Sequence, residues 1–177
     1  MSEPIHAPAI EQVPEYFRQY LNQIEEADLL LALRAESIRL RDLLREFNEE
    51  RAGFRYADGK WSVREILGHM LDSERVFCYR ALCIARGERV SLPGFDENAY
   101  VAQSRSDGRS LASLVEELEN VRAATANLFV SLDGDVLDRT GTANGQPTTP
   151  RILGFIIAGH AAHHRRVLKE RYLEEWT

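Results

Sequence analysis

Four of the five histidines fall in two short stretches, GHM and GHAAHH, and imidazole nitrogens are common ligands of transition-metal ions. His160 and His164 are four residues apart, about 400° of helical rotation, so in a helix they stand on one face, one turn apart. Two imidazoles at this spacing can bind the same ion. Two alternatives stay open: the pair could be a solvated polar helix end, or His163 could replace His164 at a spacing of three.

His69 lies in a second helical stretch, on an apolar stripe that predicts a side chain directed into the bundle. It follows Ile66 by three residues and precedes Ser73 by four, on a stripe that continues to Phe77. A buried neutral histidine must satisfy both ring nitrogens or lose about 1–3 kcal/mol for each unsatisfied group. A metal ion shared with the other helix would satisfy this demand. Spacing alone does not show that the two helices meet, and an ordinary hydrogen-bonded core histidine is the alternative.

Five helical segments are predicted to position these residues, because apolar side chains recur at spacings of three and four. They run from Pro14 to Ile24, Asp28 to Phe47, Ser62 to Arg86, Ser110 to Phe129 and Thr149 to Leu173. Several starts carry capping residues, most clearly Ser62 with Glu65. No segment alternates apolar and polar residues, so no strand is expected. The prediction is an all-α, antiparallel four-helix bundle with a short extra N-terminal helix.

The remaining segments are predicted as connections. Residues 1–12 form an N-terminal tail, and residues 13–177 form one bundle domain. Loops are expected at 51–60, at 90–100 with one short helical turn after Asp96, and at 133–150, which is rich in Gly, Thr, Asp and Pro.

Composition narrows the function classes. The chain has 177 residues, 44% of them hydrophobic, which suffices for a core. Its net charge of −6 gives no support for nucleic-acid binding. The N-terminus lacks an apolar signal region and no apolar run is long enough to span a membrane, so a cytoplasmic protein with no membrane association is expected. Cys78 and Cys83 lie about 140° apart on one helix and are predicted to pack rather than to pair.

Three stretches, 60–88, 92–101 and 152–170, together resemble the DinB/YfiT-like superfamily of helical-bundle metalloproteins. The resemblance extends from about Tyr16 to Tyr172. It implies a four-helix bundle that binds one divalent metal ion through His69, His160 and His164. It also implies a homodimer, for which the leading helix and Trp176 are the candidate interface.

Three neutral imidazoles would leave a divalent ion at least one open position, as in catalytic zinc sites. Zinc is the first choice of metal, and nickel or iron can share these ligands. Ala161 follows His160, so the glutamate base of the H-E-x-x-H proteases is absent. Because several members of the superfamily transfer low-molecular-weight thiols, the resemblance implies a thiol and an electrophile as partners, in detoxification or stress response. The alternatives are a hydrolase of a small ester or amide, or a metal-binding stress protein without turnover.

Asp72 and Asp96, and less directly Glu97, are candidates for acids that support the site, with solvated or capping acids as the alternative. Arg75 and Arg80 could hold an anionic co-substrate, although surface ion pairs are the plainer expectation. An accessible cavity with a basic or polar wall would favour thiol transfer. A closed apolar lid would favour the alternatives.

Overall fold

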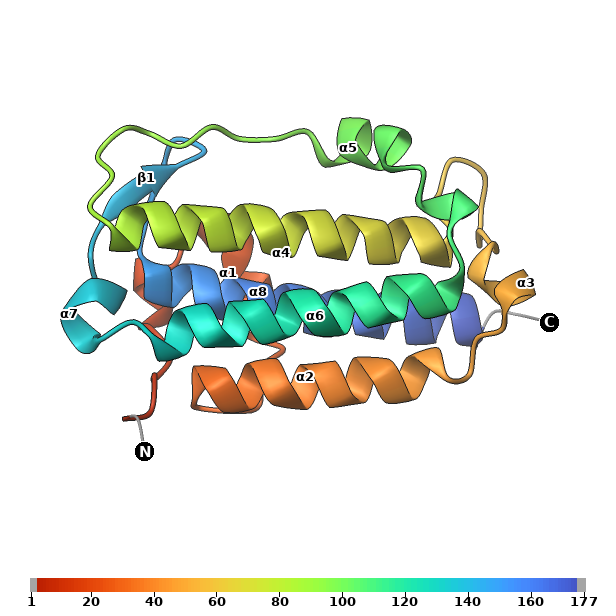
Figure 1. Cartoon of the computed structure of the whole chain (residues 1–177), viewed down its shortest axis with the longest axis horizontal. Coiled ribbons are helices and arrows are strands. Elements are labelled where there is room, and N and C mark those ends of the chain that lie inside the picture. Colours follow the sequence, from red (N-terminus) through yellow and green to blue (C-terminus); the bar gives the residue numbers. More distant parts are fainter. Residues whose placement is uncertain (1–2, 175–177) are drawn as a thin grey trace.

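The computed structural model describes residues 3–174, and four long helices dominate it (Figure 1). These are α2 (Leu29–Leu44), α4 (Val63–Ala85), α6 (Leu111–Val130) and α8 (Pro150–Val167). Helices α4 and α2 each pack against both α6 and α8. A short helix, α1 (Glu15–Leu21), packs against α8. The predicted all-α four-helix bundle with a short N-terminal helix is therefore confirmed.

The direction of the helices is set by one long connection. Helices α2 and α8 run one way and α4 and α6 the other, so α4 is parallel to α6 and antiparallel to α8 (Figure 1). The predicted antiparallel packing therefore holds for α4 with α8 and α2 with α6, but not for α4 with α6 or α2 with α8. The chain after α4 returns along the length of the bundle, through α5 (Glu97–Ser104), before α6 begins. The helical turn predicted after Asp96 is this helix, and the Asp96 side chain accepts hydrogen bonds from the N–H groups of Asn98 and Ala99.

Side-chain caps fix the helix starts close to their predicted positions. Ser62 and Glu65 form a capping box at the start of α4, and Thr149 accepts from the Ile152 N–H at the start of α8. These two caps matter for function, because α4 and α8 carry the histidines. Helix α8 continues into a π-helical segment, Leu168–Leu173.

The apolar core consists of two clusters along the bundle axis. One contains Phe77 and the α8 residues up to Ala158, and the other contains Met70 and the α8 residues from Ala161 onward. Helices α4 and α8 contribute to both. His160 lies on α8 between the two clusters, so the histidine site occupies their junction.

A β-hairpin contradicts the prediction that no strand occurs. Strands β1 (Gly141–Ala143) and β2 (Gln146–Thr148) pair antiparallel, and β1 also pairs with Leu92 in the long connection. The turn residues Asn144 and Gly145 have φ of 51° and 71°. Asn-Gly is the preferred sequence for such a turn, so the signal was present within the segment predicted as a loop.

Other predicted connections also contain short structure. One-turn helices α3 (Glu49–Ala52) and α7 (Gly134–Leu137) and 3₁₀ turns at Ile10–Gln12 and Ser106–Gly108 occur in them.

The N-terminal residues contact the bundle. Ile5 is buried, and its N–H donates to the Asp28 carboxylate at 2.8 Å. Ile5 and His6, within the predicted tail, therefore contact Asp28 at the start of α2. Trp176, named as a candidate interface residue, lies outside the described residues. None of the helices in residues 3–174 has the length and apolar character needed to cross a membrane.

Candidate metal centre

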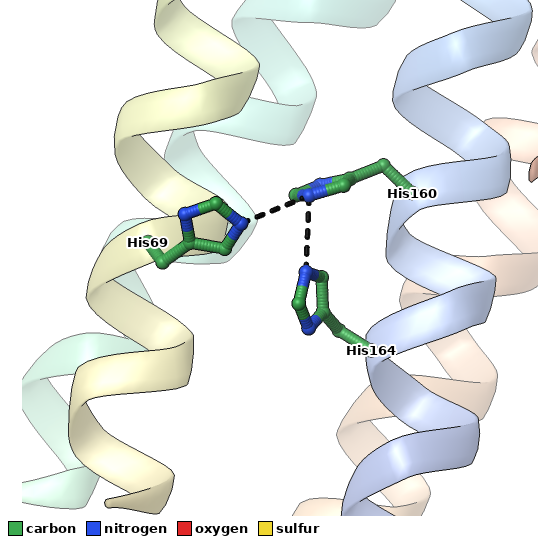
Figure 2. A group of neighbouring side chains, drawn as sticks. All are labelled: His69, His160 and His164. Atoms are coloured by element: carbon green, nitrogen blue, oxygen red, sulfur yellow. Dashed lines mark hydrogen bonds between the residues drawn. The ribbon is translucent and has the colours of Figure 1, made fainter. Parts of the chain in front are cut away.

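His69 from α4 meets His160 and His164 from α8 in the bundle interior (Figure 2). The Nε2 atom of His160 lies 3.0 Å from Nε2 of His69 and 3.0 Å from Nε2 of His164. All three side chains are buried. The structure therefore brings together the three histidines singled out from the sequence.

Burial keeps these imidazoles neutral. It lowers the pKa of His69 to about 4, with a smaller contribution from His163. Burial also holds the pKa values of His160 and His164 well below the ordinary value, and the neighbouring histidines add to this effect. Neutral imidazoles each carry a free lone pair, which is the form that binds metal ions.

The donor set fits a divalent metal ion. Nitrogen ligands of a tetrahedral zinc ion, bound at about 2.0–2.1 Å, lie roughly 3.3 Å apart. The ligand nitrogens of His69, His160 and His164 all lie within 4.8 Å of one another. Without an ion, the three converging nitrogens could be linked only by hydrogen bonds, and each such bond needs one nitrogen that carries a proton. A cation at their centre would satisfy all three lone pairs.

Contacts around the triad orient the rings. The Ser73 hydroxyl lies 3.5 Å from Nδ1 of His69, on the side of the ring away from His160. The ring of Trp61 packs against His69 at 4.8 Å with the ring planes tilted by 41°, and the ring of Tyr20 meets His160 edge-on at 5.6 Å. Nδ1 of His164 is buried and has no hydrogen-bond partner within residues 3–174.

His163, the rival ligand considered from the sequence, does not join the group. It is only half-buried, and its ring packs against Tyr20 at 5.3 Å. Gly159 precedes His160 on α8 and faces the backbone of α1. A Cβ there would approach the Tyr20 carbonyl carbon to 2.5 Å, so this glycine permits close packing of α1.

A cavity of about 510 Å³ reaches two members of the triad, His69 and His160, whereas His164 is not among its lining residues. Its walls come from α1, α4, the long connection and the hairpin turn. His69, Ser73 and His160 line its inner part, and Phe95, Asn144 and Gln146 line the part formed by the connection and hairpin. No motif in the sequence pointed to Phe95, Asn144 or Gln146, because these residues belong to segments predicted as loops.

Arg80 also lines this cavity and does not form the surface ion pair that was the plainer expectation for it. It is 5% exposed, and its Nη2 donates to the Pro93 carbonyl at 2.8 Å. None of the ion pairs within residues 3–174 includes it. The expected surface ion pair is formed by Arg75, with Glu117.

The candidate acids occupy different places. Asp72 is half-buried on α4, where burial raises its pKa, and it does not line the cavity. Asp96 caps α5 and also lies outside the cavity lining. Glu97 and Glu15 do line the cavity, as exposed side chains at its rim. The structure thus brings Glu97, rather than Asp72 or Asp96, to the cavity.

Cys78 and Cys83 are free thiols packed at the edge of the core. The Cys78 sulfur lies 3.2 Å from the Thr125 hydroxyl. Neither cysteine lines the cavity.

Comparison with known proteins places this geometry in context. A family model described as the DinB superfamily matches residues 9–168. A protein of Oceanobacillus iheyensis, provisionally named a metal-dependent hydrolase, is 23% identical over 165 residues that cover 89% of each chain.

Two solved structures share the fold. YfiT from Bacillus subtilis, described as a probable metal-dependent hydrolase with an unusual four-helix bundle topology, aligns with a TM-score of 0.69 and 19% identity, over 81% of this chain and 85% of that one. The mycothiol-dependent maleylpyruvate isomerase aligns with a TM-score of 0.66 and 13% identity, over 90% of this chain and 62% of that longer one.

Proposed function

This chain belongs to the DinB superfamily, and we propose that it is an enzyme that binds one divalent metal ion through His69, His160 and His164 and transfers a low-molecular-weight thiol to an electrophile. One observation carries the proposal: three neutral imidazoles converge, and two of them, His69 and His160, line a cavity large enough for a small molecule. Zinc is the proposed ion, with nickel or iron as alternatives.

The chain's own residues have distinct parts in this proposal. The three histidines hold the ion, and the Ser73 hydroxyl orients the His69 ring through Nδ1. Tyr20 and Trp61 pack against the imidazoles and limit the access of water. A divalent ion held by neutral ligands keeps its full charge and lowers the pKa of a thiol or water that joins it.

Thiol transfer needs little else from the protein. The thiol loses its proton to solvent through the open cavity, its sulfur forms a bond to the electrophilic carbon, and the leaving group departs with the electron pair of the broken bond. Asn144, Gln146 and the Arg80 guanidinium give this largely apolar cavity one polar and basic wall, which supports a thiol substrate.

A second candidate is hydrolysis of a small ester or amide. Glu97 at the cavity rim favours it, because hydrolysis usually requires a general base close to the attacking water. The provisional names of the Oceanobacillus protein and of YfiT point the same way.

The two candidates are separated by paired assays on protein of known metal content. We expect conjugation of a small thiol to a chromogenic electrophile, abolished by a chelator and restored by zinc. Glu97→Gln should leave conjugation within about twofold, with Glu15→Gln as the matched rim control. If instead the protein cleaves p-nitrophenyl esters, loses about 10²-fold or more of that activity in Glu97→Gln and conjugates no thiol, hydrolysis replaces thiol transfer.

A further inference from the structure

Arg80 is a buried cation within reach of the candidate centre. It lies on α4 eleven residues after His69, about 1100° of rotation, so both residues share one helix face with about 16 Å of rise between them. Helical side chains lean toward the N-terminus, which brings the guanidinium back toward the histidines. Both residues line the same cavity.

The guanidinium is held in place without being neutralised. It lies over the Phe77 ring at 5.7 Å and the Phe95 ring at 5.8 Å, and Nη2 donates to the Pro93 carbonyl. These contacts fix its plane and use one of its five N–H groups. No hydrogen bond of its other nitrogens is found among residues 3–174, and Arg80 lines the cavity, so the guanidinium retains N–H groups for a ligand.

The lack of an anionic partner distinguishes Arg80 from the other largely buried arginines of residues 3–174. Arg122 on the neighbouring helix pairs with buried Glu74, and Arg165 pairs with buried Glu36. Burial alone acts on the pKa of Arg80, lowering it, with no carboxylate opposing the effect. A buried charge without a counter-ion is costly, and a ligand that supplies the counter-ion removes this cost.

We propose that Arg80 binds a carboxylate group of the substrate, so that the cavity takes a small organic acid whose reactive group faces His69, His160 and His164. This inference rests on the proposed function for the identity of the reactive end. A planar guanidinium matches a carboxylate in a two-point hydrogen bond, and its aromatic neighbours keep water from competing. Arg80 is thus the residue that selects the substrate by charge.

Two glutamates at the cavity rim restrict the charge of the ligand further. Glu15 and Glu97 are exposed there, so a second negative group on the ligand would meet two carboxylates. Like charges in this position disfavour dicarboxylates and phosphates. The proposed ligand class is therefore the monocarboxylates.

The test uses matched ligand pairs and the full chain. Alkanoates of six to eleven carbons and the corresponding alkanols are titrated into the protein before zinc is added, because a carboxylate can also bind zinc. ω-Mercaptoalkanoates and ω-mercaptoalkanols are then titrated into the zinc-loaded protein. Calorimetry and amide chemical-shift titration give the affinities. Arg80→Gln is compared with Arg75→Gln, an arginine of the same helix that already has a carboxylate partner.

We expect the acid to bind about 10- to 100-fold more tightly than the alcohol in the wild type and in Arg75→Gln, and this preference to vanish in Arg80→Gln while alcohol binding is retained. Equal affinities for acid and alcohol in the wild type would overturn the proposal even if Arg80→Gln does not fold. So would an equal loss of both ligands in Arg80→Gln, which indicates that Arg80 only holds the Pro93 loop. Zinc content reports separately on the histidines, so failure of the metal site and failure of the carboxylate site are distinguishable.

Discussion

Two kinds of buried polar groups occur side by side in this bundle. Glu74 accepts two hydrogen bonds of 2.8 Å from Arg122 and one of 2.6 Å from the Thr125 hydroxyl. Glu36, 1% exposed, is bound by Arg165 and Arg39. Each buried charge in these clusters finds its partner within the chain.

The cavity groups lack such partners. His69, His160 and His164 converge on one another with no carboxylate among their hydrogen-bond partners in residues 3–174, and Arg80 has only a carbonyl. Polar groups that serve the fold are satisfied by the fold, because leaving them unsatisfied costs stability. Groups left incomplete inside the same core are therefore candidates for binding something that the chain does not supply.

The largest expected effect concerns the triad of His69, His160 and His164. His160→Ala should reduce bound zinc from about one ion per chain to nearly none, because two imidazoles remain from three and His160 is the one between the others. His163→Ala should retain zinc, since its ring packs against Tyr20 outside the triad. Metal analysis after dialysis measures both. Zinc retained in His160→Ala and lost in His163→Ala would show that the ligand assignment is wrong.

Substitutions in the cluster of Glu74, Arg122 and Thr125 should change the stability of the fold rather than metal binding. Glu74→Ala leaves the Arg122 charge buried without its partner and should cost about 3 to 5 kcal/mol of unfolding free energy. Zinc content should stay unchanged. Glu117→Ala removes a more exposed carboxylate that pairs with Arg75 and Arg109 and should cost about 1 kcal/mol or less. Urea unfolding with metal analysis compares the two, and similar losses would contradict the distinction between the clusters.

The sequence predicted the features that are local. Ser62 and Glu65 placed the start of α4, and the spacing of three and four placed the histidines on inward faces. The hairpin had a local signal as well, Asn144-Gly145, but it was outweighed by the surrounding polar residues. The parallel arrangement of α4 and α6 had no such signal, since it depends on the course of a 25-residue connection between Ala85 and Leu111.

The candidate site was predictable only in part, for the same reason. The meeting of His69 with His160 followed from family resemblance, not from spacing. For Arg80 a surface ion pair was the plainer expectation and an anionic co-substrate the alternative, because nothing in the sequence says that the segment around Pro93 and Phe95 covers it. The metal's identity, the homodimer and the cytoplasmic location stay predictions.

The packing around Glu74 and Thr125 should also lower the reactivity of the Cys78 thiol, which contacts Thr125. Burial raises the pKa of Cys78 from 9.0 to about 11, so at pH 8 its thiolate fraction should be about 100-fold lower than in the unfolded chain. In a Cys83→Ser background, iodoacetamide should modify native Cys78 at least that much more slowly than it does in urea. Mass spectrometry over time measures both rates. Equal rates would mean that the packing beside Thr125 opens readily.

The smallest expected effect concerns Ser73, a buried residue of α4 whose hydroxyl contacts the candidate metal ligand His69. Ser73 is fully buried on α4, and its hydroxyl is the only hydrogen-bond partner of His69 Nδ1 within residues 3–174. If it accepts from Nδ1–H, it fixes the tautomer that leaves the Nε2 lone pair for the ion. Ser73→Ala should therefore weaken zinc binding by about tenfold, at the low end for such a partner because the contact is 3.5 Å long. Competition with a chelator of known affinity measures the change. Ser73→Thr, which keeps the hydroxyl, should recover most of the affinity. Unchanged zinc affinity in Ser73→Ala would mean that packing against Trp61 alone orients the His69 ring. The hydrogen bond from Ser73 would then contribute nothing to this ligand.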